Sequence, residues 1–588
     1  MKKIVSVLTI FLTLLAFSGV LHAQGDKVQF GAYSRTLQQT NRLGKSDTLH
    51  SDNISQGSLL VDLGIHVNPD KNTQVSTILR LKSDLGGFYG GGNTATIRQI
   101  YVRGIVGKFL NYHVGDLFMK MTPYTMFNND AELSVNEATV FKNLRNDYVY
   151  YDNFNKGNSW WQQGAHTNFA VGFQSKFLQS IKVDGFFLRN RMAVGPQPTR
   201  FHAGGRLMLV QSSRFYLGAN YLNLYDVGAS VGSKATTISV RNPVNTYESE
   251  FIAVDNNKYG LQLNAEAGFS QLNFEHDPNA PKNATGSAFT KLNGNFIDGA
   301  VTGKLKPAHL KLKVGYSYTS PRFYSSAAQT KRIDYSQTPT TFPIYGNNPL
   351  SPVNRNIGAF DIVRDPTIYN QKITPVLMQY NPAYGNATPY GKSTPNRMGF
   401  NMELNYKDSL ERVNIDFSGA YLTEAVGTDL YNSKRKFLVA SVAADVYINK
   451  FINFEKKILV HGGARMENTD RKGDSITNVN LHTQLIDAGI EVEVLKKLDL
   501  LFGAKILNAK GSENYAIRDA YNEITGYDHT TYRNMNFQQT MLGYGLKYRF
   551  SKLSYLTTQY HTYAINDMAH STKTIKFNQF FIMFIMNF

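Results

Sequence analysis

Charged side chains recur at a two-residue spacing inside otherwise apolar stretches of this chain. Lys311 and Lys313 alternate with Leu310, Leu312 and Val314, so in an extended strand the two lysines share one face. The same spacing selects a wider set of candidate residues for a water-filled interior: Arg80, Lys82, Arg103, Lys182, Arg206, Lys311, Lys313, Glu403, Asp416, Asp487, Glu491 and Glu493. The cations come first in the chain and the carboxylates later. Four residues of the same parity break this trend: Asp62, Asp184, Arg465 and Lys505.

Two electrostatic roles are compatible with these charged residues. On a closed ring of strands the cations and carboxylates would form two walls of opposite sign, whose field would orient polar solutes in a water-filled channel. Alternatively, the charges pair across neighbouring strands and only keep the interior hydrated. The sequence leaves both interpretations open.

A second candidate site lies in a loop rich in aromatic residues, from Met121 to Gln163. It holds Tyr150, Tyr151, Trp160 and Trp161, with asparagines close by. Aromatic faces and amides together can hold a sugar. The same residues can also anchor the base of a loop at a membrane interface.

Catalytic and cofactor motifs are missing from the sequence. It contains no GxSxG, HExxH or P-loop pattern, no EF-hand spacing and no cysteine. The histidines His66, His202 and His461 share the parity of the charged set, and we interpret them as hydrogen-bonded wall residues. We therefore predict no enzyme, no metal site and no cofactor; an enzyme on the barrel wall is the third hypothesis.

The elements that must position these residues are strands. Besides 310–318, the range 397–406 alternates most clearly, with Met398, Phe400 and Met402 on one face and Gly399 and Glu403 on the other. Tight turns join these strands in pairs, and several turns repeat a lysine followed by an apolar residue: Lys108-Phe109, Lys176-Phe177, Lys450-Phe451, Lys497-Leu498 and Lys552-Leu553. We predict long connections at 121–160, 228–256 and 321–395. A soluble sandwich shows the same alternation, but it does not need strands this long.

The last strand, Lys573 to Phe588, has one unbroken apolar face that ends on an aromatic residue. With Phe580, Phe584 and Phe588 at one parity, it resembles the closing strand of Gram-negative outer-membrane β-barrel proteins, including porins. The resemblance implies that the barrel-assembly machinery reads Phe588 as an assembly signal and that a long loop folds into the pore. No large domain precedes Val28, so we do not expect the plug of a TonB-dependent receptor.

The N-terminus predicts export. Lys2 and Lys3 precede an apolar run, and a small residue stands at the expected cleavage point, Ala23. We interpret 1–23 as a signal peptide and 24–588 as one all-β domain, an antiparallel transmembrane barrel of about 22 strands. Short turns should face the periplasm and long loops the exterior. The 35 Tyr and 37 Phe against 18% charged residues suit such a barrel.

The net charge of +18 restricts the partners. In an exported chain without a basic helix it indicates anionic lipid headgroups or an anion-attracting pore, and no nucleic acid. We predict an outer-membrane, porin-like channel that passes or recognises small polar solutes. The alternative is an accessory outer-membrane barrel whose surface loops, above all 321–395, dock partner proteins in a secretion, assembly or uptake complex.

Overall fold

A computed structural model describes residues 27–43, 53–85, 93–129, 134, 136–152, 156–192, 198–227, 239–275, 289–329, 332–334, 367–369, 385–427, 432–473, 478–513, 515–518, 524–528, 535–569 and 574–588. The predicted signal peptide and most of 321–395 lie outside these ranges. No helix in the described part of the chain is long and apolar enough to cross a membrane.

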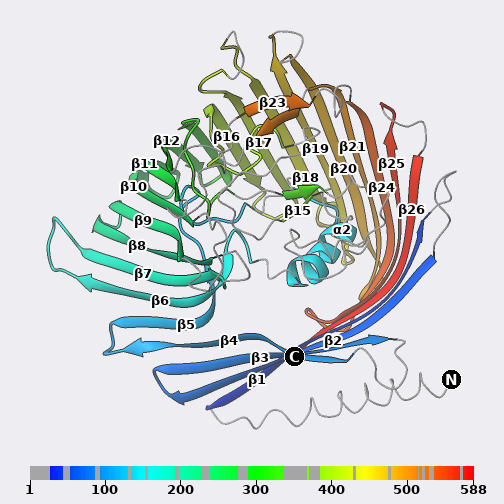
Figure 1. Ribbon diagram of the computed structural model, residues 1–588. Helices are drawn as coiled ribbons and strands as arrows, with labels where there is room; N and C mark the ends of the chain where they lie inside the picture. Colours follow the sequence, from blue (N-terminus) through cyan, green and yellow to red (C-terminus); the bar gives the residue numbers. More distant parts are fainter. Residues whose placement is uncertain are drawn as a thin grey trace, which may run out of the picture.

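The described chain forms one antiparallel sheet of 22 strands that closes on itself (Figure 1). The strands of its first half are β1 (Val28–Leu43), β2 (Asn53–Asp70), β3 (Thr73–Leu85), β4 (Thr94–Val106), β5 (Leu110–Met119), β6 (Trp160–Gly172), β7 (Ser180–Arg191), β8 (Thr199–Ser212), β9 (Phe215–Val227), β10 (Ser239–Asp255), β11 (Tyr259–Glu275), β12 (Phe289–Leu305) and β13 (Leu310–Thr319). The second half comprises β16 (Arg397–Lys407), β17 (Val413–Thr423), β18 (Lys436–Tyr447), β19 (Ile458–Arg471), β20 (Val479–Leu495), β21 (Leu498–Ser512), β24 (Met535–Arg549), β25 (Tyr555–Asp567) and β26 (Thr574–Asn587). The predicted fold class and strand number are confirmed.

The barrel closes between its first and last strands. β1 pairs with β2 on one side and with β26 on the other, with Thr36 opposite Phe584. The chain end completes this seam, because Ala32 and Phe588 exchange two backbone hydrogen bonds of 2.7 and 3.0 Å. A closed ladder leaves no unpaired strand edge.

The alternation of side chains separates an apolar outer face from a mixed inner face. The inner face is fixed by contact with segments inside the ring: Phe296 of β12 stacks on Tyr124 from such a segment. Phe296 is the register partner of Thr319, and Lys311 and Lys313 share the parity of Thr319. Leu312, Val314 and Tyr316 therefore point outward, and all three are exposed.

The connections differ between the two ends of the barrel, as predicted. One end has tight turns, such as the two-residue turn Gly107-Lys108, where both residues have positive φ. The other end has long connections. Two of these contain small two-stranded sheets, β14 (Arg332–Asp334) with β15 (Thr367–Tyr369) and β22 (Tyr515–Arg518) with β23 (Ile524–Asp528). The turn between β18 and β19 contains a 3-10 helix, η4 (Ile448–Lys450).

One predicted loop has wrong bounds, and two others contain elements that the sequence did not predict. The range 228–256 is mostly strand, because β10 begins at Ser239. The range 121–160 contains a short α-helix, α2 (Thr139–Leu144), which continues as a π-helix, η2 (Arg145–Tyr150). The range 321–395, predicted without strands, contributes β14 and β15.

Loss of the terminal residue should impair assembly. Deleting Phe588 removes both hydrogen bonds to Ala32, and Phe588→Asp puts a charge on the apolar outer face of the seam. We expect a clear fall in folded barrel in membranes, measured as heat-modifiable protein on gels. Phe588→Tyr, which keeps the backbone and the ring, serves as the control. Wild-type amounts of folded barrel in the deletion variant would contradict the prediction.

Candidate functional site in the barrel lumen

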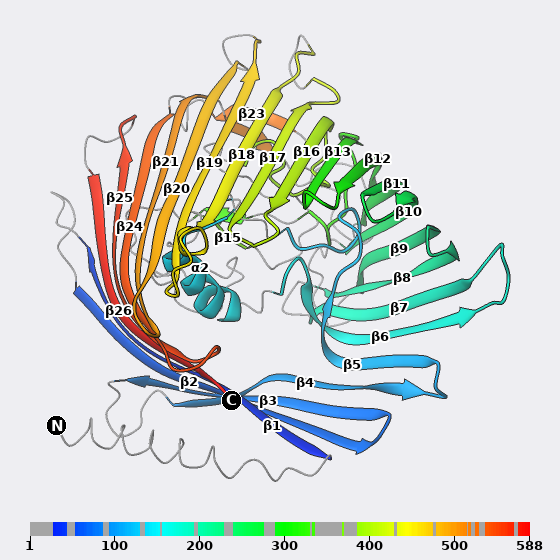
Figure 2. The ribbon, with the colours of Figure 1, turned by 180° about the vertical axis from the view of Figure 1, so that it is seen from behind.

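The lumen contains a chain segment that lies between two walls of the barrel. This inward segment, the described residues 120–129, 134 and 136–152, follows β5 in the chain and includes α2 and η2. Figures 1 and 2 both show α2 inside the ring of strands. The segment packs against β10 and β12 near its start and against β1, β20, β21, β24 and β25 near its end.

The first contact is an aromatic cluster against β10 and β12. Tyr124 has no exposed surface; its ring stacks on Phe296 at a centroid distance of 3.7 Å and meets Phe323 edge-on. Backbone hydrogen bonds hold this part of the segment, including Phe127 N–H to the Ala327 carbonyl at 3.0 Å. The beginning of the 321–395 connection therefore packs on the inward segment and fills this side of the lumen.

The second contact is apolar and depends on two glycines. Phe141 of α2 is fully buried beside Gly503 of β21 and Gly543 of β24. A Cβ atom at either glycine would lie 2.8 Å from the Phe141 ring, too close for a real contact. His561 of β25 meets the ring edge-on at 5.6 Å. Because the helix approaches the wall this closely, only glycine fits at these two positions.

A buried ion-pair chain fixes the start of α2. Glu137 accepts from Lys505 of β21 at 2.5 Å and pairs with Arg145. Asn136 donates to Asp445 of β18. Glu137, Arg145 and Lys505 are all buried. Removing one partner of such a pair leaves an uncompensated buried charge, which is strongly destabilising.

The end of η2 is held by β1 and β25. The Arg35 guanidinium pairs with Asp152 at 2.9 Å and donates to the Asp147 carbonyl at 3.0 Å. Tyr33 donates to the same carbonyl at 3.0 Å, and Tyr555 donates to the Asp147 carboxylate. Burial raises the pKa of Asp147, although the Tyr555 hydrogen bond acts in the opposite direction.

Tyr151 extends this attachment to β2, β3 and β4. Its hydroxyl donates to Asp62, and its ring stacks on Tyr33 at 4.0 Å. Asp62 also accepts two hydrogen bonds of 2.8 Å from Arg80 and pairs with Arg98 at 3.1 Å. These contacts of Arg35, Asp62, Asp147 and Asp152 attach the end of the inward segment to the barrel.

The predicted lumen residues mostly have partners on the adjacent strand, on the strand beyond it or in an adjoining turn. Besides Arg80, the pairs are Arg103 with Gln74, Arg206 with Glu248, Lys313 with Glu403, Asp416 with Asn405, Glu491 with Lys457 and Glu493 with Arg549. Lys82 pairs with Asp84 along its own strand, and Asp487 lies buried 3.9 Å from Lys505. Lys311 stands opposite Lys304 and Asn405, and Lys182 opposite Ala170 and Met208. This pattern favours cross-strand pairing over two walls of opposite sign.

The predicted loop aromatics are packed against protein. Trp160 is 3% exposed and donates from its indole N–H to the Ala327 carbonyl at 2.7 Å. Trp161 stands opposite Phe118 on β5. Tyr150 packs against the apolar cluster under α2, and its ring lies below the Arg145 guanidinium. In this arrangement Tyr151 attaches the inward segment to β2, and Trp160 of β6 holds the beginning of the 321–395 connection at Ala327.

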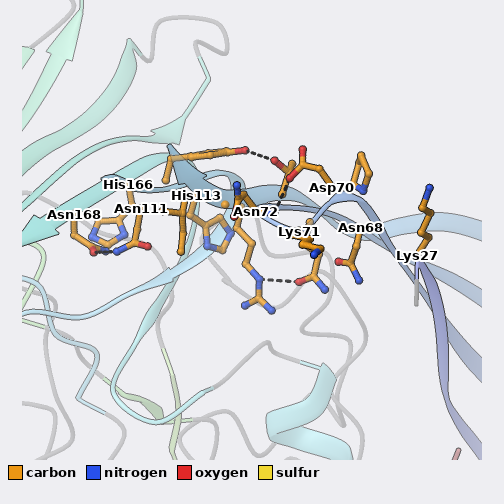
Figure 3. Close-up of a pocket in the computed structure, with 16 residues that line it drawn as sticks. Lys27, Asn68, Asp70, Lys71, Asn72, Asn111, His113, His166 and Asn168 are labelled. Carbon is orange, nitrogen blue, oxygen red and sulfur yellow. Dashed lines mark hydrogen bonds between the residues drawn. The ribbon is translucent and has the colours of Figure 1, made fainter. Parts of the chain in front are cut away.

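The turn end of the lumen has an open depression of about 890 Å³ (Figure 3). Arg103, His113 and His166 line it, with the β2–β3 turn around Asp70 at its rim. His113 lies 3.0 Å from the Asp116 carbonyl, and His166 lies 3.5 Å from Asp184. Most of the residues that line the depression are polar or charged, so it can take water and hydrophilic solutes. Within the described residues no group of three or more potential ligands has the arrangement of a metal site.

Sequence reasoning missed the residues that attach the inward segment, above all Arg35, Glu137 and Asp147. One signal was present. Asp62 and Lys505 broke the charge trend along the chain, and each is the barrel-wall partner of the inward segment. The other two residues that broke the trend, Asp184 and Arg465, pair with barrel residues His166 and Glu467, so the signal holds for two of the four.

Structural similarity is found with other outer-membrane proteins at very low sequence identity. Acinetobacter baumannii OccAB2 is 8% identical, with 96% of this chain and 100% of that chain covered and a TM-score of 0.33. Pseudomonas aeruginosa OccK2 (OpdF), solved in complex with glucuronate, is 7% identical, with 95% and 98% covered and a TM-score of 0.33. The FrpB iron transporter of Neisseria meningitidis is 8% identical, with 97% and 83% covered and a TM-score of 0.44.

No protein-family model and no curated protein sequence matches this chain. The closed barrel is established by the chain's own strand pairing. With its apolar outer face, its closing strand and its inward segment, the chain has the architecture of a porin-like outer-membrane β-barrel.

Proposed function

We propose that this chain is a channel of the bacterial outer membrane that passes or recognises small polar solutes, with the inward segment as its constriction. One observation carries the proposal. The inward segment is docked on two walls, while the turn end of the lumen keeps acidic and basic side chains accessible to solvent, such as Lys311 and Glu403. A confined aqueous space lined by charge selects solutes by size and polarity.

The membrane location rests on the outer face of the barrel. Exposed Phe, Leu, Ile and Val side chains alternate with inward polar ones on strands all around the ring, including Val301, Val314, Val442, Ile490, Leu546 and Ile582. A soluble protein does not expose apolar surface on this scale. Lipid is therefore the first partner, and the barrel-assembly machinery, acting on the strand that ends at Phe588, is the second.

Single-channel recording in planar bilayers tests the proposal. The purified, folded full chain should give discrete, reproducible conductance steps, and sugars or amino acids added to one side should reduce the current if they enter the lumen. A heat-denatured sample of the same preparation is the control. A folded barrel that inserts but stays electrically silent would contradict the channel function.

A second proposal is an accessory barrel whose loop 321–395 docks a partner protein. Both ends of this connection lie together inside the lumen, because Gln329 donates to the Ser393 carbonyl at 2.8 Å. The two described ends of the connection are therefore held at one point, a geometry suited to a surface loop. Specific co-purification of a partner with the full chain, lost when 335–366 is deleted, would support it.

A further inference from the structure

The short turns share a feature that the channel function does not use. A lysine precedes an apolar residue in several of them, and these apolar side chains are exposed: Phe109 is 61% exposed, Phe177 88% and Leu553 65%. We propose that the turn end of the barrel binds anionic phospholipid headgroups, with lysines on the phosphates and the adjacent apolar side chains in the acyl region. This inference rests on the membrane location given under the proposed function.

Three of the five lysines that precede an apolar residue in these turns are available for a ligand. Of the other two, Lys450 lies 3.8 Å from Glu411, and Lys497 donates to the Phe550 carbonyl. Among the described residues, Lys108, Lys176 and Lys552 have no carboxylate partner, whereas Lys306 of another turn pairs with Asp255 at 2.8 Å. An unpaired ammonium next to an apolar side chain matches the boundary between phosphate and acyl chain, because lysine keeps its charge in water while its stem covers apolar surface.

Backbone conformation supports a requirement for lysine at two turns. Lys108 and Lys497 have φ of 67° and 69°. This left-handed region favours glycine and asparagine and is uncommon for a long side chain. Lys108 follows Gly107, which also has positive φ, so the turn places a lysine where asparagine or glycine would be less strained.

The occupant is lipid rather than a soluble partner, because the exposed side chains continue the outer apolar face. Val171 and Phe173, at the end of β6, are exposed and lead directly to the turn that contains Phe177. The turn between β18 and β19 adds to this surface. Phe451 and Ile452 are exposed there, and the Arg412 guanidinium lies 5.0 Å from the Phe451 ring.

Native mass spectrometry of the folded full chain in a neutral detergent tests the proposal with two lipid probes, short-chain phosphatidylglycerol and phosphatidylcholine. Wild type should bind phosphatidylglycerol more tightly, and the preference should weaken at high salt. In the triple variant Lys108→Gln, Lys176→Gln and Lys552→Gln, affinity at these turns should fall roughly five-fold for each lysine removed. Phe177→Ser should weaken the binding of both lipids.

A matched variant controls for net charge. Arg103→Gln, Lys182→Gln and Lys311→Gln remove the same charge from the lumen and should leave lipid affinity unchanged. Inorganic phosphate at equal concentration should not displace the lipid; displacement would assign the lysines to free phosphate. Equal binding of the two lipids by wild type, or wild-type affinity in the turn variant, would overturn the proposal.

The same preparations separate this proposal from the channel function. The turn variant should keep wild-type conductance, since none of its changes lies in the lumen. A silent barrel that still prefers phosphatidylglycerol would contradict only the channel. A conducting barrel without lipid preference would contradict only the lipid site.

Discussion

Phe141→Ala should raise the single-channel conductance several-fold, with frequent transitions to a larger open state. Phe141 is fully buried between α2 and the wall at Gly503 and Gly543. Truncating a buried phenylalanine costs about 3–5 kcal/mol. The short helix α2 is stable only because it packs on the barrel wall. The lost free energy should therefore release α2 from the wall, while the 22-stranded ladder stays intact.

The controls for this prediction separate release from general damage. Phe187→Ala removes an outward ring of equal size from β7 and should leave conductance unchanged. Glu137→Gln should act in the same direction as Phe141→Ala, because it leaves the buried Lys505 and Arg145 without their carboxylate. Wild-type conductance in Phe141→Ala, with normal folded yield, would show that the inward segment does not limit ion flow.

The sequence predicted the barrel because the relevant signals are local. Alternation at 310–318 and 397–406 depends on residues two positions apart, and the tight turns depend on adjacent residues. The strand β10 was missed because its first half contains Asn242 and Pro243. The ladder to β11 is interrupted at these two residues, and the Asn242 amide donates to the Gln271 and Tyr324 carbonyls instead.

The inward segment could not be predicted in the same way. Its six-residue helix α2 is too short to be stable alone, so its apolar residues show no usable period. Its partners lie far away in the chain: Arg35 and Asp152 are separated by 117 positions, and Glu137 and Lys505 by 368. Such contacts exist only after the barrel has closed, whereas two of the wall charges that receive them, Asp62 and Lys505, were visible in the sequence as exceptions to the charge trend.

The charged and apolar faces of β13 should respond in opposite ways to substitution. Lys311→Glu reverses a charge that faces the lumen beside Lys304 and Asn405. We expect the reversal potential in a salt gradient to shift towards cation selectivity, with little loss of folded barrel. The double change Lys313→Glu with Glu403→Lys exchanges an existing pair 3.4 Å apart and keeps the local net charge, so it should leave selectivity unchanged.

Val314→Arg should instead reduce the yield of folded barrel without altering the selectivity of the molecules that fold. Val314 is 42% exposed on the outer face, in the middle of the ten-residue strand β13. A lipid-facing arginine costs about 2–4 kcal/mol near the membrane midplane and about 0–1 kcal/mol near the interface. Leu312→Arg, two residues closer to the turn, should therefore have a smaller effect than Val314→Arg. Heat-modifiability and reversal potential, measured on all four variants, test which face of β13 borders water. If Lys311→Glu lowers the folded yield more than Val314→Arg, the lysine face of β13 does not border water.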